Sequence, residues 1–175
     1  MSLFKHIVCL MFCFLMFSCE EKPKQKNQNV TITKDQSADF NKQLIKELNF
    51  TINDYIKRNG WQVETTPTGV RYMIYEEGKG IQAESGMIAL IEFEVYLLDG
   101  TKCYSSKDEG IKQFKIEQSD VESGLHEAVQ HMKVGDRAKV ILPHYRAHGL
   151  IGDSKKIPPL SPIIYDVYLK ALSKY

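Results

Sequence analysis

The chain has 175 residues, of which 23 are Lys or Arg and 22 are Asp or Glu, giving a formal net charge of +1. This length accommodates one domain with its own core plus an appendage, but it is too short for two ordinary domains. The near balance of charge argues against a nucleic-acid-binding protein, because such proteins carry a surplus of cations that neutralises phosphates.

Residues 1–18 predict an export signal. One cation, Lys5, precedes an apolar run of eleven residues over 7–17 that ends at Ser18-Cys19, which is the layout of a secretory signal. As a helix this run would cover only about 16 Å, well short of the ~30 Å core of a bilayer, so a spanning helix is disfavoured. Removal of the signal would leave 22 basic and 22 acidic residues.

The string LMFSC, residues 15–19, resembles the lipobox of bacterial lipoproteins. The resemblance implies cleavage before Cys19 and lipid attachment to that cysteine. The protein would then be anchored in the bacterial cell envelope, at the outer membrane or a periplasm-facing membrane. Ordinary signal cleavage nearby stays open, because Met16 and Phe17 are looser than the usual lipobox residues. The polar and charged residues 19–36 predict a flexible tether.

Residues 37–60 predict an N-terminal helix. Its apolar residues fall four apart along one stripe: Phe40, Leu44, Leu48, Ile52 and Ile56. Ser37 or Asp39 would cap the start of this helix, and Asn59-Gly60 would end it. Two interpretations of the stripe stay open: the helix packs on its own domain, or it binds a partner, for example as a dimer through residues 37–60.

The rest of the chain predicts strands around one short helix. Alternating apolar residues indicate strands over 70–74, 88–98, 114–116, 137–142 and 163–172. Asp99-Gly100 predicts a hairpin turn. Leu125 to Met132 place apolar side chains on one face of a short helix, which Val134-Gly135-Asp136 would end. One helix packed on an antiparallel sheet is an α+β fold.

Cysteine counting leaves Cys103 without a disulfide partner, since Cys9 and Cys13 lie in the signal and Cys19 would carry lipid. The sequence shows neither the base nor the electropositive setting that a nucleophilic thiol needs. Cys103 is therefore interpreted as a small buried residue. The histidines beyond the signal do not converge on one face, so no metal site is predicted, and no cofactor is expected.

Four strings in the second part of the chain together resemble the FKBP family of peptidyl-prolyl cis/trans isomerases. They are TPTGVRYMIYEEGKG (66–80), LIEFEVYLLDGTKCYSS (90–106), GLHEAVQHMKVGDRAKVILP (124–143) and IPPLSPIIYDVYLKAL (157–172). The resemblance covers residues 66–175. It implies a half-wrapped antiparallel β-sheet around one short helix, with a proline-binding pocket between them.

The resemblance also implies which side chains form this pocket. Phe93, Phe114 and Tyr165 match aromatic wall positions, and Val121 matches a valine at the rim. Leu125 stands where many members have a tryptophan floor, which implies a smaller floor.

Other matched positions depart from the family pattern. Tyr104 stands in place of an aspartate, Cys103 in place of a wall phenylalanine, and Glu122 in place of an apolar rim residue. His148 falls at the position of a hydrogen-bonding tyrosine, with Tyr145 as a rival for that role. The loss of the aspartate implies weakened catalysis.

The resemblance implies a membrane-anchored isomerase that acts on X–Pro bonds of exported or envelope proteins. The order of signal, tether and leading helix also resembles the FKBP-like lipoproteins associated with gliding motility in Bacteroidetes-type bacteria. The alternative is an FKBP-like chaperone or binding module of an envelope assembly, with little or no catalysis. Proline-containing polypeptides are the expected clients of either form, and the lipid the expected contact with the membrane.

Overall fold

The computed structural model describes residues 34–118 and 120–174. The elements follow in the order α2 (Lys34–Arg58), β1 (Glu64–Thr65), β2 (Arg71–Glu76), β3 (Ile88–Leu97), β4 (Lys102–Ser105), α3 (Ser106–Glu109), β5 (Lys112–Lys115), α4 (Ser123–Gln130), β6 (Arg137–Leu142), a 3-10 turn η2 (His144–Arg146) and β7 (Ile163–Ser173). The predicted α+β class, with its N-terminal helix, is confirmed.

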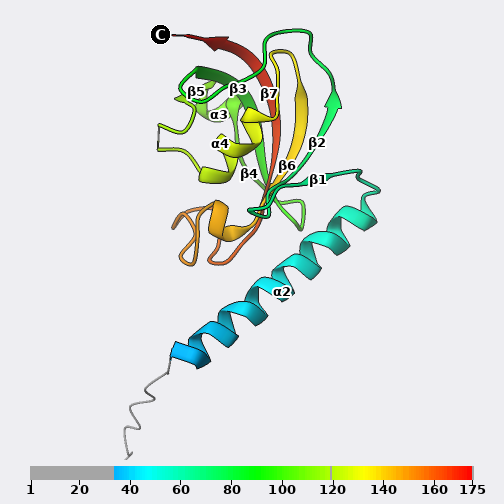
Figure 1. Cartoon of the computed structure of the whole chain (residues 1–175), viewed down its shortest axis with the longest axis vertical. Helices are drawn as coiled ribbons and strands as arrows, with labels where there is room; N and C mark the ends of the chain where they lie inside the picture. The colour runs from blue at the N-terminus through cyan, green and yellow to red at the C-terminus, as the bar shows by residue number, and fades with distance from the viewer. Residues whose placement is uncertain (1–33, 119, 175) are drawn as a thin grey trace, which may run out of the picture. The chain divides into compact units, whose positions relative to one another are not determined.

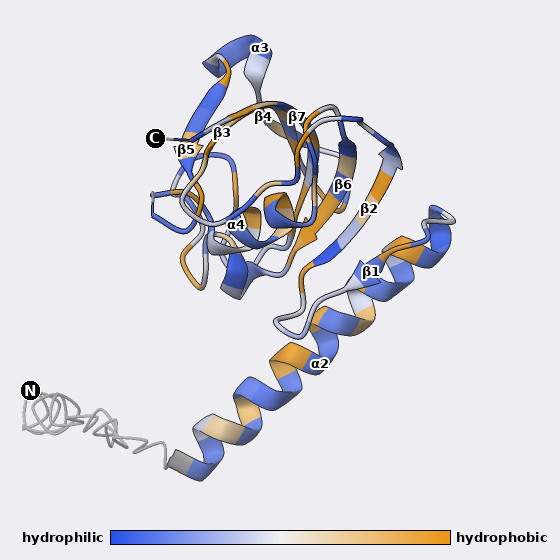
Figure 2. Cartoon of the chain, turned by 45° about the horizontal axis from the view of Figure 1, so that its top comes forward, coloured by the Kyte–Doolittle hydropathy of each residue, from blue (hydrophilic) through white to orange (hydrophobic). Residues whose placement is uncertain are grey.

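The sheet has the strand order β1-β2-β6-β7-β3-β4, with β5 paired to β3, and its pairings are antiparallel. Strands β3 and β7 form the longest ladder, from Ile88 opposite Ser173 to Leu97 opposite Ile163. The sheet curves around α4, which lies on its inner side (Figures 1 and 2). The predicted Asp99-Gly100 turn joins β3 to β4.

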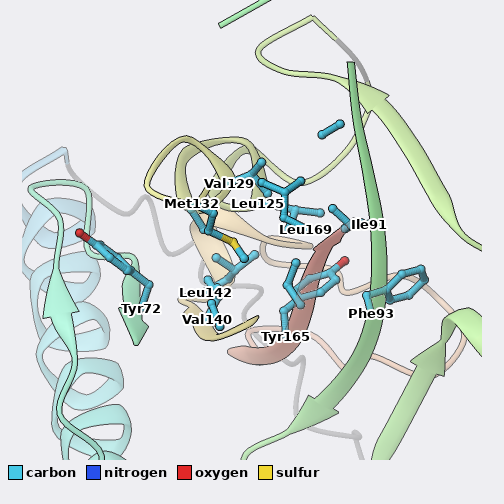
Figure 3. Packing of buried hydrophobic residues seen from close by; sticks show 14 of the residues in the cluster. Tyr72, Ile91, Phe93, Leu125, Val129, Met132, Val140, Leu142, Tyr165 and Leu169 are labelled. Atoms are coloured by element: carbon cyan, nitrogen blue, oxygen red, sulfur yellow. The ribbon is translucent and has the colours of Figure 1, made fainter. Parts of the chain in front are cut away.

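The main core lies between α4 and the inner face of the sheet. Alternate residues of a strand point to opposite faces, so β7 sends Ile163, Tyr165, Val167 and Leu169 inward. Helix α4 meets them with Leu125, which is fully buried. Figure 3 shows Leu125, Val129 and Met132 facing side chains of β6 and β7 across this core.

Gly124 lets α4 lie close to the sheet. A Cβ atom at this position would stand 2.6 Å from Cδ2 of Leu142 on β6 and 3.1 Å from the Arg146 backbone oxygen. A larger residue would require the Leu142 side chain or the backbone at Arg146 to shift. Because the candidate site lies at the start of this helix, the glycine also fixes one wall of that site.

The outer face of the sheet carries a second, smaller cluster, to which α2 contributes. Leu48 and Ile52 of α2 pack on Ile141 of β6 and Ile164 of β7, the residues that alternate with the inner-facing ones. Trp61 and other half-buried side chains close the edge of this cluster. The second half of α2 therefore packs on its own domain, and pairing through residues 37–60 stays a prediction.

A buried cation also ties α2 to the sheet. Arg71 on β2 is 5% exposed, and its guanidinium donates to the Asn49 side-chain oxygen of α2 at 2.7 Å and to the Gly69 backbone oxygen at 2.7 Å. The first half of the helix differs, because Phe40 is 66% exposed and Ile45 is 42% exposed. Figure 2 shows hydrophobic bands recurring along the helix.

The predicted start of this helix is wrong by one turn. It begins at Lys34, so residues 34–36 of the predicted tether are helical and neither Ser37 nor Asp39 caps the helix. The segment KDQSAD contains no Gly or Pro that would stop the helix from extending toward the N-terminus. The end is as predicted, since α2 stops at Arg58 and Gly60 adopts a positive φ of 66°.

The export signal, Cys19 and most of the predicted tether lie outside the described residues. Among the helices that the structure describes, none combines the length and apolar character needed to cross a bilayer.

Candidate functional site

A cavity of about 240 Å³ opens between the middle of β3 and β7, the start of α4 and the loop that precedes β7. Its lining combines aromatic, aliphatic and charged side chains. The lining residues are Phe93, Val95, Tyr104, Glu109, Lys112, Glu122, His148, Asp153, Lys155, Ile157 and Tyr165.

Two aromatic side chains form the inner wall of this cavity. Phe93 on β3 and Tyr165 on β7 lie on neighbouring strands and both point to the inner face of the sheet. Their ring centroids are 6.1 Å apart with the planes tilted by 50°, and each residue is at most 4% exposed. Val95, also buried, continues the apolar wall along β3.

Glu122 holds a carboxylate against this wall, one residue before α4. Its Oε1 accepts hydrogen bonds from the Tyr165 hydroxyl at 2.8 Å and from Nε2 of His148 at 3.1 Å. Burial raises the pKa of Glu122, but the hydrogen bond from His148, the charge of Lys112 and the hydrogen bond from Tyr165 outweigh it and bring the pKa to about 2. The hydrogen bond to Glu122 in turn raises the pKa of His148. Oε2 of Glu122 is buried and has no hydrogen-bond partner within residues 34–118 and 120–174.

A second carboxylate, that of Asp153, lies on the opposite side of the cavity. The Tyr104 hydroxyl donates to its Oδ2, and the backbone N–H groups of Lys155 and Ile157 donate to its Oδ1 at 2.9 and 2.8 Å. Burial raises the pKa of Asp153, but these hydrogen bonds outweigh it and lower the pKa to about 2. Burial and the bond to Asp153 raise the pKa of Tyr104 to about 12. The cavity therefore contains the carboxylate that position 104 lacks, supplied from a different loop.

Lysines lie over three of the aromatic rings. Nζ of Lys112 lies 4.9 Å from the centroid of the Phe93 ring, and Nζ of Lys156 lies 4.9 Å from that of the Tyr104 ring. Nζ of Lys112 is also 5.9 Å from the centroid of the Tyr165 ring. These distances are within the range of a cation–π contact. The mouth of the cavity thus has charges of both signs above an apolar wall.

Five of the eight side chains predicted for the pocket line this one cavity. The structure brings together Phe93, Tyr104, Glu122, His148 and Tyr165.

The other three predicted side chains are not among the lining residues. Phe114 and Leu125 belong to the core and are at most 4% exposed, and the half-buried Val121 packs against that core. All three belong to or pack against the core that also contains the aromatic wall. Leu125 is smaller than the tryptophan that many family members have at this position, and its side chain is fully buried in the core.

The structure shows where both candidates for the position of the hydrogen-bonding tyrosine lie. His148 lines the cavity, whereas Tyr145 is 41% exposed and its hydroxyl lies beside Gly69, away from the cavity. Cys103 is buried as predicted, at 2% exposure, and its thiol lies 3.6 Å from the Lys156 backbone oxygen. Burial raises the pKa of Cys103, which disfavours a reactive thiolate.

The resemblance missed Asp153 and Lys112. A local signal for Asp153 exists in the sequence, because an aspartate in a loop accepts hydrogen bonds from N–H groups two residues further on, as it does here from Lys155. Its meeting with Tyr104, 49 residues earlier in the chain, depends on the tertiary structure. Lys112 reaches the cavity because β5 pairs with β3 beside the aromatic wall.

The described part of the chain contains no group of His, Cys, Asp and Glu side chains that could hold a metal ion. Within the cavity, both carboxylates are held by hydrogen bonds rather than poised to exchange a proton at neutral pH. The arrangement suits binding and conformational chemistry, in which a ligand contacts an apolar wall and polar groups of fixed orientation.

A profile of the family described as FKBP-type peptidyl-prolyl cis-trans isomerase matches residues 79–170, more than half of the chain. Among curated proteins, the probable FKBP-type peptidyl-prolyl cis-trans isomerase FkpA of Neisseria meningitidis is 34% identical over 117 residues, which cover 66% of this chain and 43% of that protein. FkpA of Aeromonas hydrophila is 33% identical over 112 residues, which cover 64% of this chain and 41% of that protein. The chain thus spans less than half the length of these curated relatives.

Solved structures share the architecture. The crystal structure of a peptidyl-prolyl cis-trans isomerase from Pseudomonas syringae superposes with a TM-score of 0.65 at 21% identity, covering 76% of this chain and 96% of that one. The N-terminal domain of FKBP42 from Arabidopsis thaliana gives a TM-score of 0.61 at 21% identity, covering 65% and 93% of the two chains. These likenesses confirm the predicted FKBP-like fold.

Proposed function

Because this chain belongs to the family of FKBP-type peptidyl-prolyl cis-trans isomerases, we propose that it catalyses the cis/trans isomerisation of X–Pro bonds in polypeptide clients. The observation that carries the proposal is the buried pair of Phe93 and Tyr165, which walls a cavity large enough for a proline ring. No bond is broken in this reaction, so the site needs neither a nucleophile nor a metal.

The reaction requires the imide bond to twist out of plane. Amide resonance sets a barrier of ~18–20 kcal/mol, and uncatalysed exchange takes tens to hundreds of seconds. A site lowers this barrier by binding the twisted form more tightly than either planar form. Because the twisted imide loses its charge separation along with its resonance, an apolar wall favours it over the more polar planar forms.

The residues of this chain divide that task. Phe93, Val95 and Tyr165 provide the apolar surface for the proline ring. Hydrogen bonds from Tyr165 and His148 fix the Glu122 carboxylate, and one from Tyr104 fixes that of Asp153. Neither carboxylate can therefore turn toward a bound proline ring. The polar groups thus orient the client backbone around a wall that stays apolar.

The test measures the X–Pro exchange rate by NMR on a short proline peptide with micromolar full-length chain. We expect exchange well above the uncatalysed rate, and a loss of about tenfold or more in Phe93→Leu, which keeps an apolar side chain but removes the ring surface. Tyr168→Phe is the matched control, since Tyr168 lies on β7 but points to the other face, under Arg137. Exchange at the uncatalysed rate with the folded wild-type protein would contradict the proposal.

One observation favours a second candidate, a module that binds prolyl segments with little catalysis. Besides its apolar wall, the cavity is lined by Glu109, Lys112 and Lys155 as well as the two held carboxylates. Charges that fit the planar, more polar imide would stabilise the ground state and reduce catalysis. In the same NMR experiment this candidate predicts shifts of the proline signals without faster exchange.

We extend the proposal to the place where the protein acts. The LMFSC string supports lipid attachment at Cys19 and anchoring in a bacterial envelope, with exported proteins as clients. Radiolabelled fatty acid should appear on the wild-type protein and be lost in Cys19→Ala, while Cys13→Ala retains it. Label that persists in Cys19→Ala would exclude this attachment site.

The arrangement of signal, polar segment and leading helix supports a role with the gliding-motility machinery. This finer proposal predicts that cells lacking the gene spread more slowly on agar, and that the wild-type gene restores spreading. Normal spreading of the deletion strain would remove the gliding role and leave the isomerase proposal untouched.

A further inference from the structure

A second hollow, of about 440 Å³, lies where α2 meets the loop between η2 and β7. This volume is within the range of ligand-binding clefts. Three elements supply its apolar walls: α2 with Leu44 and Leu48, the β3–β4 hairpin with Leu97 and Leu98, and the loop with Leu160 and Pro162. We call this hollow the α2 groove.

The charges around the α2 groove have one sign. Glu47 on α2 and Asp99 in the hairpin lie at its rim, and no Lys or Arg is among its lining residues. Both acidic residues are exposed, so they meet solvent and any charged group that enters. An acidic rim beside apolar walls favours a ligand that carries a cationic group next to an apolar part.

His144 adds an unsatisfied polar group to the groove. It lines the groove, it is 4% exposed, and its Nδ1 has no hydrogen-bond partner within the described part of the chain. Burial lowers the pKa of His144, so the ring is neutral at pH 7. A neutral imidazole nitrogen makes one hydrogen bond, for example to a peptide group, and a buried polar group without one is costly. Because Nδ1 itself is buried, His144 forms part of the groove wall and does not by itself indicate a ligand.

The α2 groove and the isomerase cavity share two elements. On β3, Val95 lines the cavity and Leu97 lines the groove, a separation of about 7 Å along a strand. In the loop, Ile157 lines the cavity and the next residue, Pro158, lines the groove. A single extended polypeptide could thus contact both sites within a few residues.

We propose that the α2 groove binds an apolar, lysine- or arginine-containing segment of the same polypeptide client whose X–Pro bond occupies the cavity. The inference rests on the proposed function, since it extends the client beyond its proline. The occupant is a polypeptide because β3 and the loop before β7 continue from the cavity into the groove, so that one extended chain can contact both, and it is basic because the rim is acidic. Helix α2 then acts as one wall of a client-binding surface.

The first experiment measures binding to the full-length chain by fluorescence anisotropy, with a labelled peptide of about twelve residues that spans ~40 Å when extended. The peptide is rich in leucine and phenylalanine, carries two lysines and has no proline, and a matched peptide has glutamates in place of the lysines. We expect the basic peptide to bind more tightly than the acidic one. Leu160→Glu should weaken binding of the basic peptide about tenfold or more, because it places a charge in an apolar wall.

Two further variants test specificity. Ile151→Glu is the matched control, because Ile151 lies in the same loop, is 75% exposed and lines neither site; it should bind as the wild type does. Glu47→Lys should weaken the basic peptide about two- to fivefold, the size of an exposed charge effect, and should not weaken the acidic one. Equal binding by wild type and Leu160→Glu would overturn the proposal.

The second experiment separates this inference from the proposed function. A short X–Pro peptide that fills only the cavity should be isomerised equally by wild type and Leu160→Glu, whereas a longer peptide that joins X–Pro to the basic apolar segment should show a higher KM in Leu160→Glu. Binding of the proline-free peptide without isomerisation of the short one would refute the isomerase and keep the groove. A concentration-dependent dimer in analytical ultracentrifugation that Leu160→Glu abolishes would instead assign the groove to a second copy and overturn the inference.

Discussion

The two faces of the β-sheet differ in the size of the hydrophobic cluster that packs on each. The inner face and α4 enclose one continuous core that includes the wall of the candidate cavity. The outer face holds only a small cluster, in which Leu48 and Ile52 of α2 rest on Ile141 and Ile164. The domain thus has a rigid side that forms the cavity and a lightly attached side that forms the α2 groove.

This difference separates the two functions proposed for the chain. A site for a twisted imide needs an apolar wall of fixed shape, because preference for one conformation depends on fit. A groove for varied client segments tolerates a wall that can shift. Damage to the inner face should therefore affect both stability and isomerisation, and damage to the outer face should affect the groove first.

The largest expected effect is on the inner face. Leu125→Ala should lower the free energy of unfolding by about 2–5 kcal/mol, since Leu125 is fully buried and the truncation leaves a cavity. Urea unfolding followed by circular dichroism measures this value. Because Leu125 lies behind the site wall, isomerisation of a short peptide should also decrease. A loss below about 1 kcal/mol would show that the inner core is not the tightly packed side.

The sequence predicted the inner face well for a physical reason. In β6 and β7 the apolar residues alternate regularly, and the pleat of a strand turns that alternation into two faces. The short helix was predicted from the apolar face over Leu125–Met132, and the structure places it at Ser123–Gln130. By contrast, the start of α2 was misplaced, because KDQSAD lacks an apolar pattern and its helical state depends on local propensity alone.

A matched truncation on the outer face should cost less. Ile52→Ala should lower the free energy of unfolding by about 2 kcal/mol, the low end of the range for a buried isoleucine, because α2 can detach before the sheet unfolds. Trp61 lies at the edge of this cluster, so its fluorescence should change at lower urea than the circular dichroism of the sheet. Coincident transitions at both probes would contradict the separation of the two faces.

The Arg71–Asn49 hydrogen bond offers a more local way to loosen α2. Asn49→Ala should destabilise the protein by about 1–3 kcal/mol, because it leaves a buried guanidinium N–H without its acceptor. Gln43→Ala, on the exposed part of the same helix, is the control and should change little, since the Gln43 side chain donates to Glu47 of the same helix. Isomerisation of a short peptide should be unchanged in both variants. Equal stability of the two variants would show that the buried bond does not secure α2.

The candidate site was predictable only in part, because the rest of it depends on contacts between residues that are far apart in the sequence. Positions on β3 and β7 carried over from the family because strand register fixes where their side chains point. The replacement of an aspartate by Tyr104 implied a lost carboxylate. The structure shows instead that Asp153 supplies one from a loop, through a hydrogen bond from Tyr104 itself. No pattern in either stretch alone reveals that the two residues meet.

The smallest expected effect concerns Glu122 and His148 at the site. It distinguishes the two faces of the sheet by the pH dependence of the protein's stability. Folding lowers the pKa of Glu122 from 4.5 to about 2, so its contribution to stability is present above pH 4.5 and is lost as the pH falls toward 2. Folding raises the pKa of His148 above 6.5, so its contribution is present below pH 6.5 and is lost as the pH rises through the folded value. Together the pair stabilises the protein most between about pH 4.5 and 6.5.

Glu122→Gln should flatten this profile without opening the site, because the amide oxygen still accepts from Tyr165 and His148 while the charge is gone. We expect a loss of about 1 kcal/mol near pH 5.5, a smaller loss above pH 8, and an NMR titration of His148 that moves down toward 6.5. The outer-face pair of Lys139 and Asp166, with Nζ–Oδ2 at 2.5 Å, provides the comparison. Lys139→Met removes this pair and should leave the NMR titration of His148 unchanged, because Lys139 and Asp166 lie on the opposite face of the sheet from the site. A His148 titration unaltered by Glu122→Gln would show that the inner-face pair is not coupled, and the pH contrast between the two faces would then disappear.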